Sequence, residues 1–242
     1  EMYNCVGSCF FFIFSFIFTV SVYSQKQTPS RVPNSVYEKP NPPTFKFENL
    51  ILNQTERQPV TSQINIVVNS RQMIAILPNG FKISKPVTNE TIRRTDEFGN
   101  IAFILTNKNL MAVSNVSQNW VVQELFAETY PAYSIGNSYI LVATEKKIYI
   151  FSKVFNAWKQ IPIEAESILL MDSFDMTATV ITTKRILCFS DFDRELKEVS
   201  YNLLNERVSS VHVFNEKAVF VTSHKTLVFK SLMSEFDLHP SF

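Results

Sequence analysis

From residue 45 onward, short runs of β-branched and aromatic residues are separated by small clusters of polar residues. No run keeps the 3.6-residue period of an amphipathic helix over a useful length. Short apolar runs bounded by polar turn residues are typical of β-strands. The pattern therefore predicts an all-β fold for residues 45–242.

The runs recur as five repeats, which span residues 64–79, 101–121, 139–159, 177–197 and 217–237. Each repeat reads as an apolar strand, a short polar turn, a second apolar strand, another polar turn and an outer strand. The residue that follows the first apolar run is Asn69, Thr106, Thr144, Thr182 or Thr222, so successive repeats lie 37 to 40 residues apart. A period near 40 with short strands predicts the blades of a β-propeller.

Less apolar segments supply a first strand to four blades, at residues 91–98, 132–137, 167–174 and 208–214. The turns between strands 2 and 3 then lie near Ser70, Asn107, Glu145, Thr183 and Ser223. Strands 2 and 3 are apolar at nearly every position, because blades stacked face to face bury both sides of a strand. We expect about five four-stranded blades, which either close with residues 45–53 or belong to a larger propeller.

The N-terminal residues predict export. Residues 10–22 form an uncharged run of about 13 residues, the length of the apolar part of a signal peptide and too short for a spanning helix. We interpret residues 1–24 as a signal peptide cleaved before Gln25, residues 25–44 as a Pro-rich linker and residues 45–242 as the propeller. An uncleaved N-terminal anchor is the alternative. The expected location is the secretory-pathway lumen or the extracellular space, or the periplasm or cell surface of a bacterium.

Export bears on the cysteines and on glycosylation. Cys188 is the only cysteine after residue 24, so the mature chain has no internal disulfide, and its apolar neighbours predict a buried small hydrophobe. Glycosylation sequons begin at Asn53, Asn89 and Asn115.

Composition and motifs give no sign of catalysis. A formal net charge of +1 gives no reason to expect nucleic acid, and only 4 glycines are available for phosphate-binding loops. The three histidines lack metal-ligand spacing, and no nucleophile elbow or P-loop occurs. The pairs Asp172/Asp175 and Asp191/Asp193 could serve a glycosidase, but we assign them to hairpin turns, where Asp is favoured locally. We therefore predict no catalytic residue, metal or cofactor.

Basic residues recur in the strand 2–3 turns: Arg71, Lys108, Lys146 with Lys147, Lys184 with Arg185, and Lys225 beside His224. We take Arg71, Lys108, Lys146 and Lys184 as the candidate binding residues. Repetition would arrange them as a ring on one face, able to orient an acidic partner, although ordinary solvated turn charges explain the same pattern. The opposite connections are expected to carry acidic residues: Asp96, Glu97, Asp172, Asp175, Asp191, Asp193, Glu195, Glu216 and Glu235. Trp120 and Trp158 share one register position, which favours packing between blades over a ligand platform.

Residues 140–162, with Ser152, Phe155 and Trp158, resemble a blade of the sortilin-type sorting receptors, and residues 114–120 and 190–192 have the same shape. The resemblance implies half of a large lumenal propeller that binds peptide ligands. On these grounds we expect a non-catalytic binding propeller of the secretory pathway with a protein or peptide ligand and no nucleic acid. A membrane would be reached only through a segment beyond this chain or an uncleaved anchor. The alternative is a free-standing, five-bladed secreted propeller that hydrolyses or binds carbohydrate.

Overall fold

The computed structural model describes residues 51–52, 63–125, 132–201 and 206–240, all within the compact unit Pro40–Phe242. The predicted signal peptide, the linker and the sequon at Asn53 lie outside the described residues. The described residues form strands and turns, and none of them is helical. No helix among them could therefore cross a membrane.

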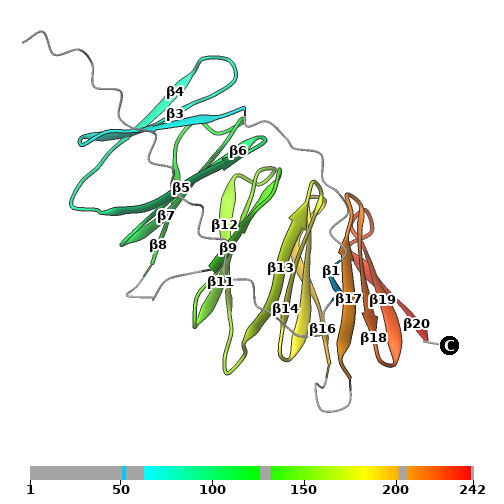
Figure 1. The fold of residues 1–242 in the computed structure, drawn as a ribbon. Coiled ribbons are helices and arrows are strands. Elements are labelled where there is room, and N and C mark those ends of the chain that lie inside the picture. Colours follow the sequence, from blue (N-terminus) through cyan, green and yellow to red (C-terminus); the bar gives the residue numbers. More distant parts are fainter. Residues whose placement is uncertain (1–50, 53–62, 126–131, 202–205, 241–242) are drawn as a thin grey trace, which may run out of the picture. The chain divides into compact units, whose positions relative to one another are not determined.

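The strands form five antiparallel sheets in chain order (Figure 1). Sheet I contains β2 (Asn65–Val68), β3 (Gln72–Ile76) and β4 (Lys82–Pro86). Sheet II contains β5 (Ile92–Phe98), β6 (Ile101–Thr106), β7 (Asn109–Ser114) and β8 (Val121–Glu124). Sheet III contains β9 (Ala132–Ile135), β10 (Tyr139–Ala143), β11 (Lys147–Ser152) and β12 (Ala157–Pro162).

Sheet IV contains β13 (Ile168–Phe174), β14 (Thr177–Thr182), β15 (Arg185–Ser190) and β16 (Asp193–Ser200). Sheet V contains β17 (Val208–Val213), β18 (Lys217–Thr222), β19 (Lys225–Lys230) and β20 (Glu235–Pro240). A further strand, β1 (Ile51–Leu52), pairs in parallel with β17. The fold is thus a β-propeller of five blade-like sheets, as the repeats predict.

Each predicted strand 2–3 turn is a hairpin in the structure. Sheets II to V have four strands joined in the order of the sequence, and sheet I has three described strands, which correspond to strands 2, 3 and 4 of the other sheets. The first strands of sheets II to V lie where the less apolar segments predict them.

Among the described residues, the core consists of four apolar clusters, one between each pair of successive sheets. Within β6, Ala102 and Ile104 belong to the cluster shared with sheet I, whereas Ile101 and Phe103 belong to the cluster shared with sheet III. Alternate side chains of an inner strand therefore serve different clusters. Because both faces are buried, the sequence of the strand is apolar throughout.

Side-chain hydrogen bonds also join neighbouring sheets, and their partners lie about one repeat apart in the sequence. The indole Nε1 of Trp120 donates to the carbonyl of Ile83 over 37 residues, and that of Trp158 donates to the carbonyl of Val121 over another 37. Both indoles pack against the apolar clusters between sheets. The prediction that these tryptophans pack between blades is confirmed.

The terminal sheets are buried less completely than the inner ones. Every residue of β6, β10 and β14 is buried, whereas burial alternates along β3 and β18. In β18, Ala218 and Phe220 pack against sheet IV while Val219 and Val221 are half-buried. An inner sheet is thus covered on both faces and a terminal sheet mainly on one.

Candidate binding surface of the strand 2–3 turns

A polar side chain at the end of strand 2 builds each strand 2–3 turn. The Thr182 hydroxyl accepts hydrogen bonds from the backbone N–H groups of Lys184 and Arg185, at 3.1 and 3.0 Å. Equivalent bonds occur at Thr106, Thr144 and Thr222, and in sheet I the Asn69 Oδ1 atom replaces the hydroxyl. Such local bonds fix a tight turn, which explains the recurrence of Thr and Asn at this position.

A glutamate sixteen residues earlier completes three of these turns. The hydroxyls of Thr106, Thr182 and Thr222 donate to Glu90, Glu166 and Glu206 at 2.6, 2.5 and 2.7 Å. The sequence did not lead us to this partnership, although its constant spacing is visible there. The same spacing puts Glu128 sixteen residues before Thr144, but Glu128 lies outside the described residues.

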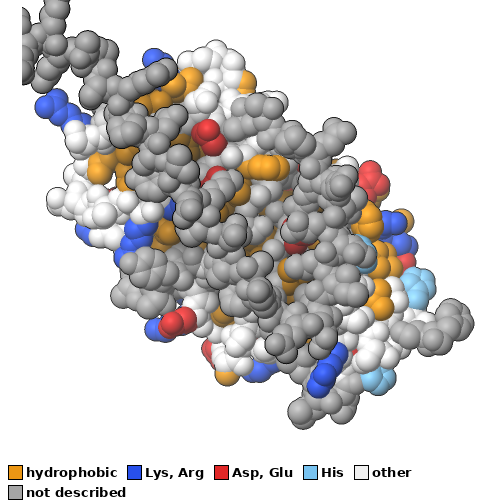
Figure 2. All heavy atoms as spheres, in the orientation of Figure 1, with side chains coloured by type: hydrophobic (Ala, Val, Ile, Leu, Met, Phe, Trp, Pro, Cys, Tyr) orange, Lys and Arg blue, Asp and Glu red, His pale blue; other side chains and the backbone are white. Residues whose placement is uncertain are grey.

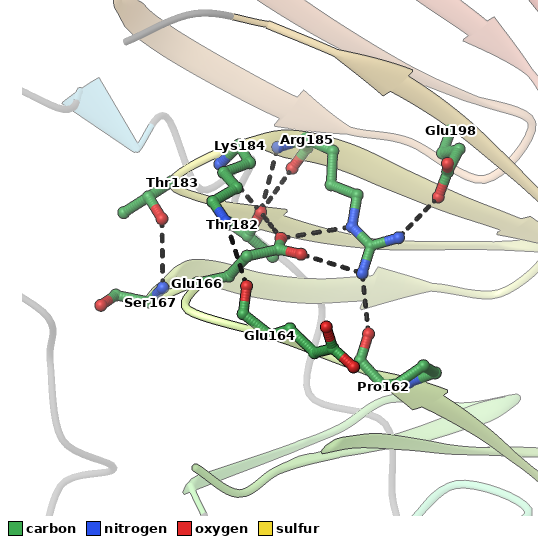
Figure 3. A network of polar contacts seen from close by, with 9 residues as sticks. All are labelled: Pro162, Glu164, Glu166, Ser167, Thr182, Thr183, Lys184, Arg185 and Glu198. Carbon is green, nitrogen blue, oxygen red and sulfur yellow. Dashed lines mark hydrogen bonds and ion pairs between the residues drawn. The ribbon is translucent and has the colours of Figure 1, made fainter. Parts of the chain in front are cut away.

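The carboxylate of Glu166 is the centre of the most extensive network (Figure 3). Its Oε1 and Oε2 atoms accept from the Arg185 guanidinium at 3.0 and 3.2 Å, and the Glu166 side chain is only 7% exposed. Arg185 also pairs with Glu198 at 2.9 Å and donates to the carbonyl of Pro162 in sheet III at 2.8 Å. Burial alone lowers the pKa of Arg185, but the bonds to Glu166 and Glu198 raise it overall.

A similar pair in sheet V joins Glu206 to Lys225 at 3.2 Å. Burial raises the pKa of Glu206, but hydrogen bonds from Thr222 and Lys225 outweigh it and hold the pKa below its usual range. The cation three residues after the threonine is therefore neutralised within sheets IV and V. It is not available as a free charge for a ligand.

The predicted binding residues occupy a different position, two residues after the Thr or Asn. Arg71, Lys108, Lys146 and Lys184 are all exposed at this equivalent position in sheets I to IV. None of the four forms an ion pair with another described residue. The Lys184 Nζ atom donates to the backbone carbonyl of Glu164 at 3.0 Å and has no carboxylate partner among the described residues.

The predicted acidic face is only partly correct. Asp175, Asp191 and Glu216 lie in turns at the other end of the sheets. The remaining residues lie within strands: Asp96, Glu97, Asp172, Asp193, Glu195 and Glu235. On the face shown in Figure 2, Lys and Arg side chains are scattered and stand beside Asp and Glu at several points. The charge pattern therefore belongs to individual turns and not to two uniform faces.

The prediction that Asp172/Asp175 and Asp191/Asp193 lie in hairpin turns is correct for only one member of each pair. Asp172 lies in β13 and Asp193 begins β16, where Asp193 pairs with Lys197 at 3.4 Å. Asp175 accepts a hydrogen bond from Asn137 at 2.7 Å, and Asp191 accepts one from Ser152 at 3.2 Å. Both bonds join sheet III to sheet IV.

Asp191 is nevertheless an unusual carboxyl group. Burial raises its pKa, and the charge of Asp175 adds to the increase. The nearby Tyr139 hydroxyl, the hydrogen bond from Ser152 and the charge of Lys153 oppose it. The structure therefore brings together one member of each sequence pair. Among the described residues, His, Cys, Asp and Glu side chains form no group of three able to hold a metal ion.

A second polar series links the strand 1–2 turns. Asn100 donates to Asn137 at 3.0 Å, and Asn137 in turn donates to Asp175. Asn215 occupies the equivalent turn of sheet V, and its carbonyl accepts from Thr177 at 2.9 Å. Asn or Asp recurs in these turns at the spacing of the repeats, and this recurrence is visible in the sequence.

The other residues singled out from the sequence have the following surroundings. Cys188 is fully buried, and burial raises the pKa of its thiol, which donates weakly to Thr179. Asn89 is exposed. Asn115 is exposed too, but its side chain donates to Asn100 at 3.1 Å and Ser117 of its sequon is 3% exposed.

No protein-family model and no curated protein matches the chain. Among solved structures, the N-terminal domain of Nup159 is similar with a TM-score of 0.35 and 10% identity, over 76% of this chain and 60% of that one. Kluyveromyces lactis Hsv2 is similar with a TM-score of 0.35 and 13% identity, over 72% of this chain and 58% of that one. The chain thus spans about three fifths of the length of these proteins.

A further similar structure is the extracellular domain of the putative one-component system BT4673 from B. thetaiotaomicron. It has a TM-score of 0.34 and 13% identity, over 78% of this chain and 30% of that one. Similarities at this level carry no argument about activity.

Proposed function

We propose that this chain is a non-catalytic binding propeller that captures an acidic protein or peptide on its strand 2–3 turns. The observation that carries the proposal is the equivalent placement of Arg71, Lys108, Lys146 and Lys184. A ligand that follows successive sheets would meet one exposed cation from each turn. Cations of this kind attract and orient acidic partners over a range set by the ionic strength.

The neutralised cations support a distinction between cations that stabilise a sheet and cations that are free to bind a ligand. Arg185 and Lys225 are held by carboxylates that also bind the turn threonines, so their charges stabilise the sheet. The exposed cations one position earlier take no part in these carboxylate contacts. They cost the fold little when substituted, which leaves binding as the role that their position supports best.

The absence of catalysis is part of the proposal. The carboxylates Asp175, Asp191 and Asp193 each hold a hydrogen bond or an ion pair between or within sheets. A glycosidase would instead need two carboxyl groups that face a shared sugar site. We accordingly prefer a binding function to a glycosidase.

The proposal places the protein in the secretory pathway or outside the cell, as the uncharged segment at residues 10–22 predicts. The sortilin-type resemblance of residues 140–162 supports a receptor-like lumenal domain with a peptide ligand. Mature protein is then expected to begin at or near Gln25, which N-terminal sequencing of secreted material measures. Retention of residues 10–22 in a membrane fraction would contradict the expected cleavage.

The binding surface is tested with a fluorescent oligoglutamate peptide as the probe. Changing Arg71, Lys108, Lys146 and Lys184 together to Gln should weaken binding about tenfold or more at low salt, and less at high salt. The matched control changes four lysines outside these turns, Lys82, Lys85, Lys153 and Lys217, to Gln and loses the same charge. Equal weakening in both variants would show that only net charge matters and would refute the turn surface.

A further inference from the structure

A cavity of about 260 Å³ lies between sheets III and IV. Its apolar lining includes Tyr139 and Ile150 of sheet III and Phe189 of sheet IV, which all belong to the cluster between these sheets. Its charged lining residues are two cations, Lys159 and Arg194, and one carboxylate, Asp193, which pairs with Lys197. Neither the strand 2–3 turns nor the proposed function uses this cavity.

The cavity lies at the interface in which the repeated tryptophan is missing, and Ile150 and Lys159 of the paired strands β11 and β12 line it. Phe151 pairs with Trp158, and Ile150 pairs with Lys159 one residue further along the same two strands. In sheet IV, Cys188 pairs with Lys197, which puts Leu196 at the position of Trp158. In sheet II, Ala112 pairs with Val121, which puts Trp120 at that position. The two preceding interfaces therefore contain an indole where this interface has a leucine.

The hydrogen-bond acceptor for the indole recurs as well. Trp120 and Trp158 donate to the carbonyls of Ile83 and Val121, which occupy equivalent positions in sheets I and II. The same register gives Lys159 in sheet III, and Lys159 lines the cavity. Leu196 has no N–H group in its side chain to offer to that carbonyl.

Sheet IV is irregular on its side of the cavity. The pairing of β15 with β16 shifts register between Cys188 and Ser190, so the outer strand is irregular next to Leu196. Leu196 packs against the apolar cluster between sheets III and IV. Its side chain is smaller than an indole, and the irregular strand does not close the remaining space.

Polar groups at the cavity favour a ligand that is not purely apolar. The Tyr139 hydroxyl is buried and has no hydrogen-bond partner among the described residues. Burial raises its pKa, and the negative charge of the nearby Asp191 carboxylate raises it further. The Arg194 guanidinium lies 5.1 Å from the centre of the Phe155 ring, and Lys159 Nζ donates to the Arg194 carbonyl at 2.7 Å. Neither cation forms an ion pair with a described carboxylate.

We propose that this cavity binds the aromatic side chain of a partner polypeptide, with an indole as the best fit and acidic residues beside it. The ring would take the place that Trp158 takes in the preceding interface, and its N–H group would reach the Lys159 carbonyl. Lys159 and Arg194 would favour carboxylates on either side of the ring. The site is separate from the strand 2–3 turns.

The test uses indole and two five-residue peptides, Gly-Gly-Trp-Gly-Gly and Glu-Gly-Trp-Gly-Glu with blocked ends, in titrations followed by protein NMR. Indole is expected to bind with a Kd on the order of 1 mM. The acidic peptide is expected to bind at least threefold more tightly than the neutral one. Arg194→Gln should remove that preference and leave indole binding unchanged.

Leu196→Trp supplies the missing indole from within the chain and should weaken indole and peptide binding at least tenfold. Leu232→Trp is the matched control, because Leu232 is 55% exposed in a turn of sheet V, and it should bind as the parent protein does. Ala157→Phe blocks the cavity from an exposed position if Leu196→Trp fails to fold. Absence of indole binding at 5 mM, or unchanged binding in a folded blocking variant, would overturn the site. Binding of indole without either peptide would overturn the polypeptide ligand.

The variant of the strand 2–3 turns distinguishes the cavity site from the binding surface of the proposed function. Changing Arg71, Lys108, Lys146 and Lys184 to Gln should leave indole binding unchanged. Loss of oligoglutamate binding with retention of indole binding supports two sites. Loss of indole binding in this variant would contradict a separate cavity site.

Discussion

The Thr182 hydroxyl connects three parts of sheet IV. It accepts from two backbone N–H groups of its own turn and donates to Glu166, which precedes the first strand of the same sheet. Glu166 holds Arg185 in turn, and Arg185 reaches a carbonyl of sheet III. A single hydroxyl therefore joins a turn to the start of its sheet and, through one cation, to the neighbouring sheet.

Removing either partner should destabilise the protein at neutral pH. Thr182→Val leaves a nearly buried carboxylate without one of its donors, and Glu166→Gln leaves Arg185 with a weaker acceptor. Each change should lower the free energy of unfolding by about 1–3 kcal/mol, measured by urea denaturation. The double variant should cost less than the sum, because the two side chains share one network.

Glu164 provides the control for the Thr182→Val and Glu166→Gln variants. It lies two residues before Glu166, its side chain is exposed, and only its backbone carbonyl contacts Lys184. Glu164→Gln should change the free energy of unfolding by less than about 0.5 kcal/mol. A loss as large as that of Glu166→Gln would show that net charge, and not the network, matters.

At the scale of elements, the closeness of sheets III and IV depends on a glycine. A side chain at Gly136, in the turn between β9 and β10, would place its Cβ 2.5 Å from the Ser173 Oγ and 3.2 Å from the Ser173 carbonyl oxygen in β13. The Ser173 hydroxyl is buried without a hydrogen-bond partner. The two sheets therefore have no space for a methyl group at this point.

Gly136→Ala should lower the free energy of unfolding by about 1–3 kcal/mol through this clash. Ser173→Ala in the same chain should recover part of the loss, because it removes the nearest atom. Gly80→Ala is a useful comparison: no atom lies within 4 Å, but the φ of +79° disfavours alanine. Its loss should be about 1 kcal/mol and should not respond to Ser173→Ala.

The strands could be predicted from the sequence because their apolar runs recur at a constant spacing and are bounded by Thr or Asn. The turn cations could be placed for the same reason. The partnership of Glu166 with Thr182 was missed because a constant spacing of sixteen residues does not by itself show that the two side chains meet. The cavity could not be predicted either, since Leu196 is an ordinary apolar residue until the pairing of β15 with β16 shows that it takes the register position of Trp158.

At the scale of the molecule, stability should differ between inner and terminal sheets. Backbone amides of β6, β10 and β14 lie in strands buried throughout, whereas β3 and β18 have half-exposed residues at alternate positions. Hydrogen exchange should therefore be slowest in sheets II to IV and faster in sheets I and V. Uniform protection over all five sheets would contradict this expectation and show that the terminal faces are covered.

The short parallel pairing of β1 with β17 has a consequence for the order of folding. Most contacts in the sheets join segments that lie within one or two hairpins of each other, so each sheet can form soon after its own residues leave the ribosome. Ile51 and Leu52 are different, because their partners Ser210 and Val211 belong to the last sheet. This pairing must await synthesis of sheet V, so we expect it to form in a late, slower kinetic step than the hairpins do.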